Sequence, residues 1–322
     1  MNGLTHNKII RNKSGRVRSG WIILIVMGIF EALSYGYGML VIKILRSWCI
    51  ATGNLDDTTG YASPLVDWLN DDFLPIFFQI SMEIIMIAVP VMAWRLMRHS
   101  MAEMGLAPPK RGGRELWVGM IFGIVNISVV FGLVLLEGNA RIVSLTPVFS
   151  GQAAWWIFTF IMVGFAEEIM NRGFFMSTLR RTNNMYLIVL APSVIFGCIH
   201  LSNPNVTVIS MLNIILVGVL FSYMYIKSGN IWMCIGYHIT WNIFQGVIYG
   251  MPVSGLNIKG FITTEFLQDN LFNGGGFGVE GGVLTTAVTL LGFLFVRHYY
   301  RDSTWDFCGR RESLGAGKGD EA

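Results

Sequence analysis

The feature that most constrains this chain is a series of long apolar segments with almost no charge. About 20 helical residues cross the ~30 Å hydrocarbon core of a bilayer. Charged residues make up only 13% of the 322-residue chain, against about 25% in a soluble domain. We therefore predict an all-α, polytopic membrane protein with about eight transmembrane helices, at 20–45, 73–97, 115–136, 153–181, 185–201, 206–227, 230–250 and 281–300.

The loops between these segments alternate in positive charge. Loops 48–72, 137–152, 201–206 and 251–280 together hold two lysine or arginine residues, whereas each intervening loop or the helix end beside it carries at least one, and the termini carry several. Because cytoplasmic loops are the basic ones, we predict that both termini are cytoplasmic. The basic residues form no stripe interleaved with aromatic residues, so the expected partner is the lipid bilayer and not nucleic acid.

Several glycines stand out in the apolar segments, in one long loop and in the C-terminal tail. Small residues let membrane helices approach closely, and this is predicted for Gly28, Gly36, Gly38 and Gly218. Segment 251–280, which includes three consecutive glycines, is predicted to be a mobile outer loop. The last twenty or so residues, rich in glycine and charge, are predicted to be a disordered tail.

The fourth apolar segment carries a cluster of charges. Glu167, Glu168 and Arg172 follow the uncharged stretch 155–165. A charge in hydrocarbon costs about 2.5–3.5 kcal/mol on insertion scales, so such side chains must face protein, water or one another, and they mark a candidate functional site. Residues four apart share a helix face, which predicts a Glu168–Arg172 pair. A structural ion pair explains these two residues but leaves Glu167, about 100° round the helix, available as a general base.

Two later segments contribute further polar side chains. Phe196 and His200 lie four residues apart near the end of the fifth segment, and His238 and Asn242 lie four apart in the seventh. Taken alone, His200 could be an interfacial or capping residue. His238 and Asn242 could equally be contacts between packed helices, worth roughly 0.6 kcal/mol each in membranes.

The depth of these residues lets some of them meet in one intramembrane cavity. Glu167 and His200 lie 14 and 15 residues from the cytoplasmic ends of their segments, or roughly 21–23 Å at 1.5 Å per residue. His238 lies eight residues from its own segment end, only about 12 Å deep. The acids Glu31 and Glu83 are isolated in the first two segments, and each could pair with a neighbouring helix or line a cavity.

Taken together, these residues resemble the motifs of the CPBP family, the CAAX-processing and bacteriocin-processing intramembrane proteases also called Abi proteins. The resemblance rests on Glu-Glu-x-x-x-Arg at 167–172, on Phe-x-x-x-His at 196–200 and on His-x-x-x-Asn at 238–242, in this order on successive apolar segments. It covers roughly residues 150–250. It implies a peptide hydrolase acting within a membrane, in particular a bacterial plasma membrane. The implied substrate is a membrane-associated or lipidated protein or peptide, such as a CAAX protein, a bacteriocin leader or a pheromone.

The resemblance also implies roles for individual residues. Glu167 would activate a water molecule that His200 positions or polarises. His238 and Asn242 would stabilise the oxyanion of the tetrahedral intermediate. The catalytic residues implied in this way are Glu167, Glu168, Arg172, His200, His238 and Asn242.

Two further roles belong to the same resemblance. Glu168 with Arg172 would hold either the site itself or the carboxyl end of the substrate. In a metal-dependent version, His200, His238 and Glu167 would bind zinc, which lowers the pKa of its water. The chain lacks the His-Glu-x-x-His helix of the usual zinc proteases, so we prefer a mechanism without a cofactor and keep zinc as the alternative.

We divide the chain into 1–150 with the first three helices, 151–250 as the catalytic core, and 251–322 with the outer loop, the last helix and the tail. Two other functions are open. One is a non-catalytic bacteriocin-immunity or stress protein that binds a peptide toxin. The other is a proton-coupled transporter that uses the acids and histidines as a relay. A transporter predicts more dispersed charges and internal repeats, and a pure binder need not keep both the acid and its histidines, so the enzyme is favoured.

Overall fold

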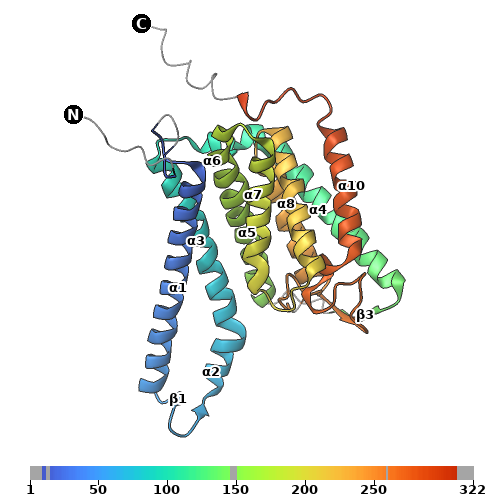
Figure 1. The fold of residues 1–322 in the computed structure, drawn as a ribbon. Helices are drawn as coiled ribbons and strands as arrows, with labels where there is room; N and C mark the ends of the chain where they lie inside the picture. Colours follow the sequence, from blue (N-terminus) through green and yellow to red (C-terminus); the bar gives the residue numbers. More distant parts are fainter. Residues whose placement is uncertain (1–8, 12–14, 146–150, 259, 310–322) are drawn as a thin grey trace, which may run out of the picture.

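The computed structural model describes residues 9–11, 15–145, 151–258 and 260–309, which form a helical bundle with two small sheets (Figure 1). The α-helices are α1 (Ser19–Ala51), α2 (Pro64–Trp68), α3 (Leu74–Leu96), α4 (Pro109–Glu137), α5 (Gly151–Glu168), α6 (Ser177–Leu179), α7 (Met185–Ile199), α8 (Val208–Ser228), α9 (Trp232–Asn242) and α10 (Val283–Tyr299). The π-helical segments are η1 (Leu69–Phe73), η3 (Ile169–Met176) and η6 (Ile243–Ile248). The 3-10 turns are η2 (Met101–Met104), η4 (Arg180–Thr182), η5 (His200–Ser202), η7 (Gly275–Phe277) and η8 (Val279–Gly281).

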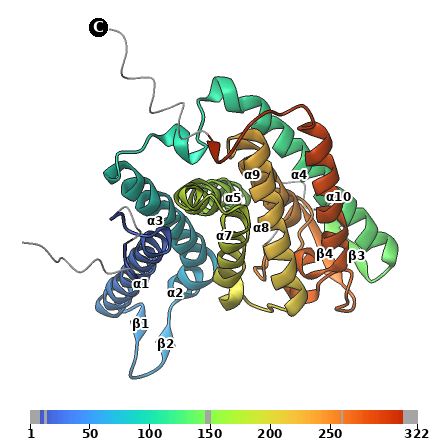
Figure 2. The same cartoon turned by 45° about the horizontal axis from the view of Figure 1, so that its top comes forward.

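Helices α1 and α3 form one side of the bundle, and α4 and α10 form the other, with α5, α7, α8 and α9 between them (Figures 1 and 2). The start of α1 lies level with η4, because Arg181 Nε donates to Ser19 Oγ over 2.9 Å. Helix α10 ends at the same end of the bundle at which α1 begins (Figure 1). This arrangement fits an even number of crossings.

The bundle confirms the predicted class of an all-α polytopic membrane protein. Within the described residues, six helical segments are long and apolar enough to cross a membrane, namely Ser19–Ala51, Leu74–Leu96, Gly112–Glu137, Gly151–Thr182, Met185–Ser202 and Val208–Ser228. Large apolar side chains such as Leu24, Leu136 and Leu291 are exposed on the outer helices. Soluble monomers rarely expose large apolar surfaces, so these faces suit lipid.

Two of the eight predicted crossings form helices that are shorter than the length expected of a membrane span. The segment predicted at 281–300 forms the 17 residues of α10, and the segment predicted at 230–250 forms the 11 residues of α9, continued by η6. Nine of the 11 residues of α9 are buried. Because protein rather than lipid surrounds this helix, it does not need the length and apolar surface of a lipid-facing span.

Close packing of α4 on α9 holds this central helix in place. A Cβ atom on Gly236 would lie 2.9 Å from the backbone nitrogen of Met120, so only glycine fits there. Thr240 Oγ1 donates to the Met120 carbonyl over 2.9 Å. Small residues and interhelical hydrogen bonds of this kind are typical of membrane helix interfaces.

The prediction of close approach at four other glycines was right at only one of them. A Cβ atom on Gly218 would lie 3.1 Å from the Ser193 side chain. The three glycines of α1, Gly28, Gly36 and Gly38, face open space. A Cβ atom at these positions would meet no described atom within 4 Å, so composition alone did not separate an interface from an outer face.

Residues 251–258 and 260–282, in a region predicted to include a mobile loop, are folded against the bundle. Strand β3 (Ala140–Leu145) pairs antiparallel with β4 (Ile262–Phe266), with Ala140 opposite Phe266. A second sheet, β1 (Leu55–Asp56) with β2 (Tyr61–Ala62), lies between α1 and α2. The loop prediction missed β4 because its partner strand is distant in sequence. Most of the predicted tail, residues 310–322, lies outside the described residues.

Candidate active site

The predicted ion pair forms where α5 meets η3. Arg172 Nη1 donates to Glu168 Oε1 over 2.9 Å, and the two side chains are only 1% and 0% exposed. The guanidinium also lies over the rings of Phe196 and Phe221, 4.6 and 5.1 Å from their centroids. The predicted pairing is confirmed. Of the two roles expected for the pair, its full burial fits holding the site rather than touching a substrate.

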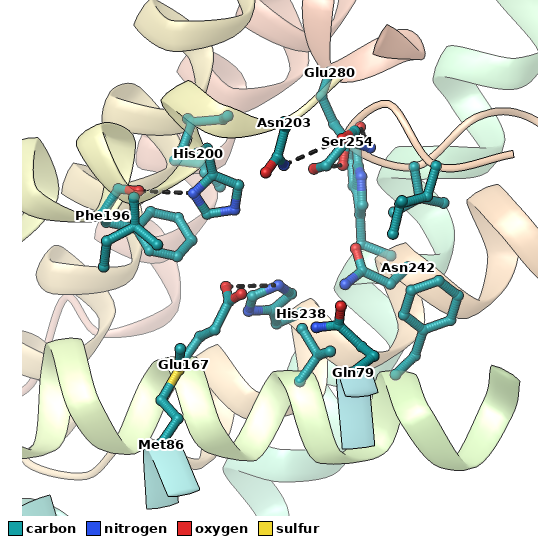
Figure 3. A pocket seen from close by; sticks show the side chains of 18 of the residues that line it. Gln79, Met86, Glu167, Phe196, His200, Asn203, His238, Asn242, Ser254 and Glu280 are labelled. Carbon is teal, nitrogen blue, oxygen red and sulfur yellow. Dashed lines mark hydrogen bonds and ion pairs between the residues drawn. The ribbon is translucent and has the colours of Figure 1, made fainter. Parts of the chain in front are cut away.

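His238, on α9, lies between the two adjacent carboxylates. Its Nδ1 is 3.1 Å from Glu168 Oε1. Its Nε2 is 3.7 Å from Glu167 Oε2, and Figure 3 shows this second contact. Because an ionised carboxylate only accepts hydrogen bonds, Nδ1 carries the proton and Nε2 is turned towards Glu167. The depths estimated from the sequence placed His238 at a different level in the membrane from Glu167. That estimate assumed straight, parallel helices that begin at one level, and the packing of α9 against α5 brings the two residues together.

His200 and Asn242 complete the set of predicted polar residues. His200 begins η5 directly after α7, and its Nδ1 donates to the Phe196 carbonyl over 2.7 Å. Its Nε2 is therefore free to accept a hydrogen bond on the side of the cavity (Figure 3). Asn242 is the last residue of α9 and only 6% exposed. The turn ends at Ser202, and Asn203 is extended, because the residue before a proline such as Pro204 disfavours the helical region.

A cavity of about 330 Å³ brings these side chains together. Glu167, His200, His238 and Asn242 all line it (Figure 3). Glu168 and Arg172 lie behind the lining. The cavity thus brings together a carboxylate, two imidazoles and an amide from three helical segments, within a wall of both apolar and polar residues.

The lining also includes a carboxylate that no motif contained. Glu280, in η8, accepts hydrogen bonds at Oε2 from the Ser254 backbone nitrogen over 2.8 Å and from Gln245 Nε2 over 2.9 Å. Burial raises the pKa of Glu280 above its ordinary value, and these hydrogen bonds and His200 oppose part of that rise. Asn203 Nδ2 donates to the Ser254 carbonyl over 3.1 Å. No sequence signal marks this group, because only tertiary folding brings these segments together.

The two isolated acids lie in different surroundings. Glu31 on α1 lines the cavity and is exposed. Glu83 on α3 is fully buried and accepts a hydrogen bond from Gln79, one turn earlier on its own helix. Gln79 in turn lines the cavity (Figure 3). Of the two alternatives given for these acids, Glu31 therefore lines a cavity. Glu83 pairs with a residue of its own helix and not with one of a neighbouring helix.

The side chains around the cavity do not have the arrangement that a zinc site requires. A zinc site needs at least three protein ligands at about 2.0–2.3 Å from one point. Across the described ranges, no three histidine, cysteine, aspartate or glutamate side chains are arranged to hold one ion. The residues as placed do not fit zinc, and no reaction step is derived through a metal.

The fold and the cavity define a class, a helical integral membrane protein whose bundle encloses a glutamate, two histidines and an asparagine. Residues 149–244 match the family model described as type II CAAX prenyl endopeptidase Rce1-like, which is consistent with the CPBP family. This range covers under a third of the chain and contains all six predicted catalytic residues. No curated protein and no solved structure matches the chain. At the level of the family, the match supports an intramembrane endopeptidase.

Proposed function

We propose that this protein is an intramembrane endopeptidase that hydrolyses a peptide bond of a membrane-associated or lipidated protein or peptide. The observation that carries the proposal is the cavity in which Glu167 Oε2, a buried atom without a hydrogen-bond partner among the described residues, meets His200, His238 and Asn242. The family description names a CAAX prenyl endopeptidase. A prenylated CAAX protein is therefore the first substrate to test, and a bacteriocin leader or a peptide pheromone is the second.

Hydrolysis at this site begins with a water molecule that hydrogen-bonds to Glu167. The carboxylate takes a proton as the water oxygen attacks the carbonyl carbon, and the carbonyl oxygen becomes an oxyanion. Asn242 Nδ2 donates to the oxyanion, as does His238 Nε2 when the ring carries its second proton. The C–N bond then breaks, and Glu167 returns the proton to the leaving amine. His200 accepts a hydrogen bond from the water at Nε2 and orients it.

Glu168 and Arg172 act on these groups indirectly. Glu168 accepts from His238 Nδ1 and so fixes which ring nitrogen faces the cavity. Arg172 neutralises Glu168 in surroundings where a lone charge would be costly. A second carboxylate next to Glu167 therefore supports the histidine and does not compete for the water.

The test is cleavage by purified protein in detergent, with quenched fluorescent peptides in farnesylated and unmodified sets. Glu167→Gln keeps the shape of the side chain and removes the base, and it should lower kcat by about 10²–10⁴-fold, the usual contribution of general base catalysis. Asp302→Asn is the matched control, because it removes a carboxylate that is 89% exposed on the surface. Full activity of the Glu167→Gln protein would refute the assignment of the base.

A further inference from the structure

Glu31 is a charged residue on the cavity wall that the proposed reaction does not use. It lies 12 residues into α1, and Glu167 lies 14 residues before Arg181, which is hydrogen-bonded to Ser19 at the start of α1. At 1.5 Å per residue, the two acids are about 18 and 21 Å from the same end of the bundle. Glu31 is therefore at nearly the depth of the proposed base, and both line one cavity.

The face of α1 that meets the cavity is built from Phe30, Glu31 and Ser34. Phe30 is only 4% exposed, whereas Glu31 is exposed. Ser34 Oγ is buried and has no hydrogen-bond partner among the described residues. Glu31 thus stands at the edge of the cavity beside α1, where a substrate segment can enter from the side of the bundle.

The charges around the cavity are unbalanced. Three carboxylates line it beside two histidines, and among the described residues no lysine or arginine does. Arg172 does not compensate, because Glu168 engages it and the rings of Phe196 and Phe221, which themselves line the cavity, lie against its guanidinium. A ligand that brings positive charge is favoured in such surroundings.

The other two lining carboxylates already lie against polar groups of the protein. Glu280 accepts from Ser254 and Gln245, and Glu167 faces His238. Among the described residues, Glu31 makes no hydrogen bond or ion pair. An ionisable residue at membrane depth is a candidate functional group whose partner must be named.

We propose that Glu31 determines specificity by binding a lysine or arginine side chain of the substrate, next to the peptide bond that Glu167 attacks. The substrate class is thereby narrowed to peptides with a basic residue close to the cleavage point. This inference rests on the proposed endopeptidase function.

The first experiment compares cleavage of three matched peptide sets that carry Lys, Gln or Glu at successive positions around the scissile bond. At one or more positions, the wild-type protein should prefer Lys over Gln in kcat/KM by about five-fold, the effect of a partly exposed ion pair. Glu31→Gln should abolish the preference, and Glu31→Lys should reverse it in favour of Glu. Asp302→Asn and Asp302→Lys are the matched surface controls and should keep the wild-type ranking.

The second experiment measures affinity without turnover, by fluorescence anisotropy of the same peptides with Glu167→Gln and with Glu31→Lys/Glu167→Gln in detergent. Reversal of the Lys-over-Glu ranking between these two proteins supports the inference even if the wild type cleaves nothing, a result that would refute only the proposed function. An unchanged ranking overturns the inference, whatever the cleavage assay shows. If Glu31→Lys fails to fold, loss of the preference in Glu31→Gln decides, because that variant adds no charge.

Discussion

Replacement of Arg172 by methionine should destabilise the folded protein far more than loss of an ordinary ion pair. Methionine keeps most of the length of the arginine side chain but removes the guanidinium that neutralises Glu168. Glu168 is 0% exposed, so its carboxylate would be left in a protein interior at membrane depth. His238 Nδ1, at 3.1 Å, would be its remaining hydrogen-bond donor.

The size of the effect follows from these contacts. Removing one partner of a buried ion pair costs about 3–5 kcal/mol, mostly from the charge left behind. The two rings at 4.6 and 5.1 Å from the guanidinium add roughly 0.5–2 kcal/mol each where the contact is desolvated. We therefore expect Arg172→Met to lower the free energy of unfolding by about 4 kcal/mol or more. Arg141→Met breaks an Arg–Glu pair with the same 2.8–2.9 Å spacing, but at 63% and 48% exposure, and it should cost no more than about 1 kcal/mol.

The measurement is equilibrium unfolding in mixed micelles titrated with dodecyl sulfate and followed by tryptophan fluorescence, for which the chain has 10 tryptophans. The double variant Glu168→Gln/Arg172→Met removes both charges and keeps an acceptor for His238, so it should recover at least about half of the loss. The reasoning is refuted if Arg172→Met costs no more than Arg141→Met, or if the effects at 168 and 172 simply add.

Three further outcomes are expected. Gly236→Ala should force α4 away from α9 and lower stability by about 1–3 kcal/mol, whereas Gly132→Ala, where a Cβ meets nothing within 4 Å, should not; thermal unfolding of both variants tests this. Burial raises the pKa of Glu280, so its contribution to stability is complete below the unfolded-state pKa and is lost as pH rises through the folded-state pKa. The stability of wild type relative to Glu280→Gln should therefore fall as pH is raised from about 4 to about 7, and a constant difference would contradict it. Because the described donors do not fit zinc, cleavage should be unchanged after dialysis against a chelator, and loss of activity that zinc restores would reinstate the metal mechanism.

The sequence predicted the parts of the protein that follow from local rules. The membrane core imposes a helix length, and six of the predicted spans correspond to helices of that length. The i, i+4 rule correctly predicted the Glu168–Arg172 pair. The sequence did not predict that Glu280, Ser254 and Asn203 meet at the cavity, because no periodicity links three loop residues from separate segments. It also could not tell the glycines of α1, which face open space, from Gly236, since all are small residues in apolar helices.

The histidine that faces Glu167 shows the same limit. The resemblance implied that His200 acts on the water that Glu167 activates, and the structure also puts His238 Nε2 3.7 Å from Glu167 Oε2. A motif gives the identity of residues and their spacing along one helix. Which imidazole reaches which carboxylate depends on how α5, α7 and α9 pack, and that packing is set by contacts outside the motifs, such as Gly236 against α4.

Two changes of helix type reinforce this point. Segment η3 begins directly after Glu168, and η6 begins directly after Asn242. All eight residues of η3 are buried, a pattern that a 3.6-residue period with one apolar face does not give. π-helical turns are rare and are frequent at functional sites. Their altered bonding leaves backbone groups that other donors must satisfy in a membrane, and here Asn171 Nδ2 donates to the carbonyl of Glu167 over 2.9 Å. The asparagine one position before Arg172 thus supports the backbone of the proposed base, which gives the residue a structural reason to stand inside the Glu-Glu-x-x-x-Arg motif.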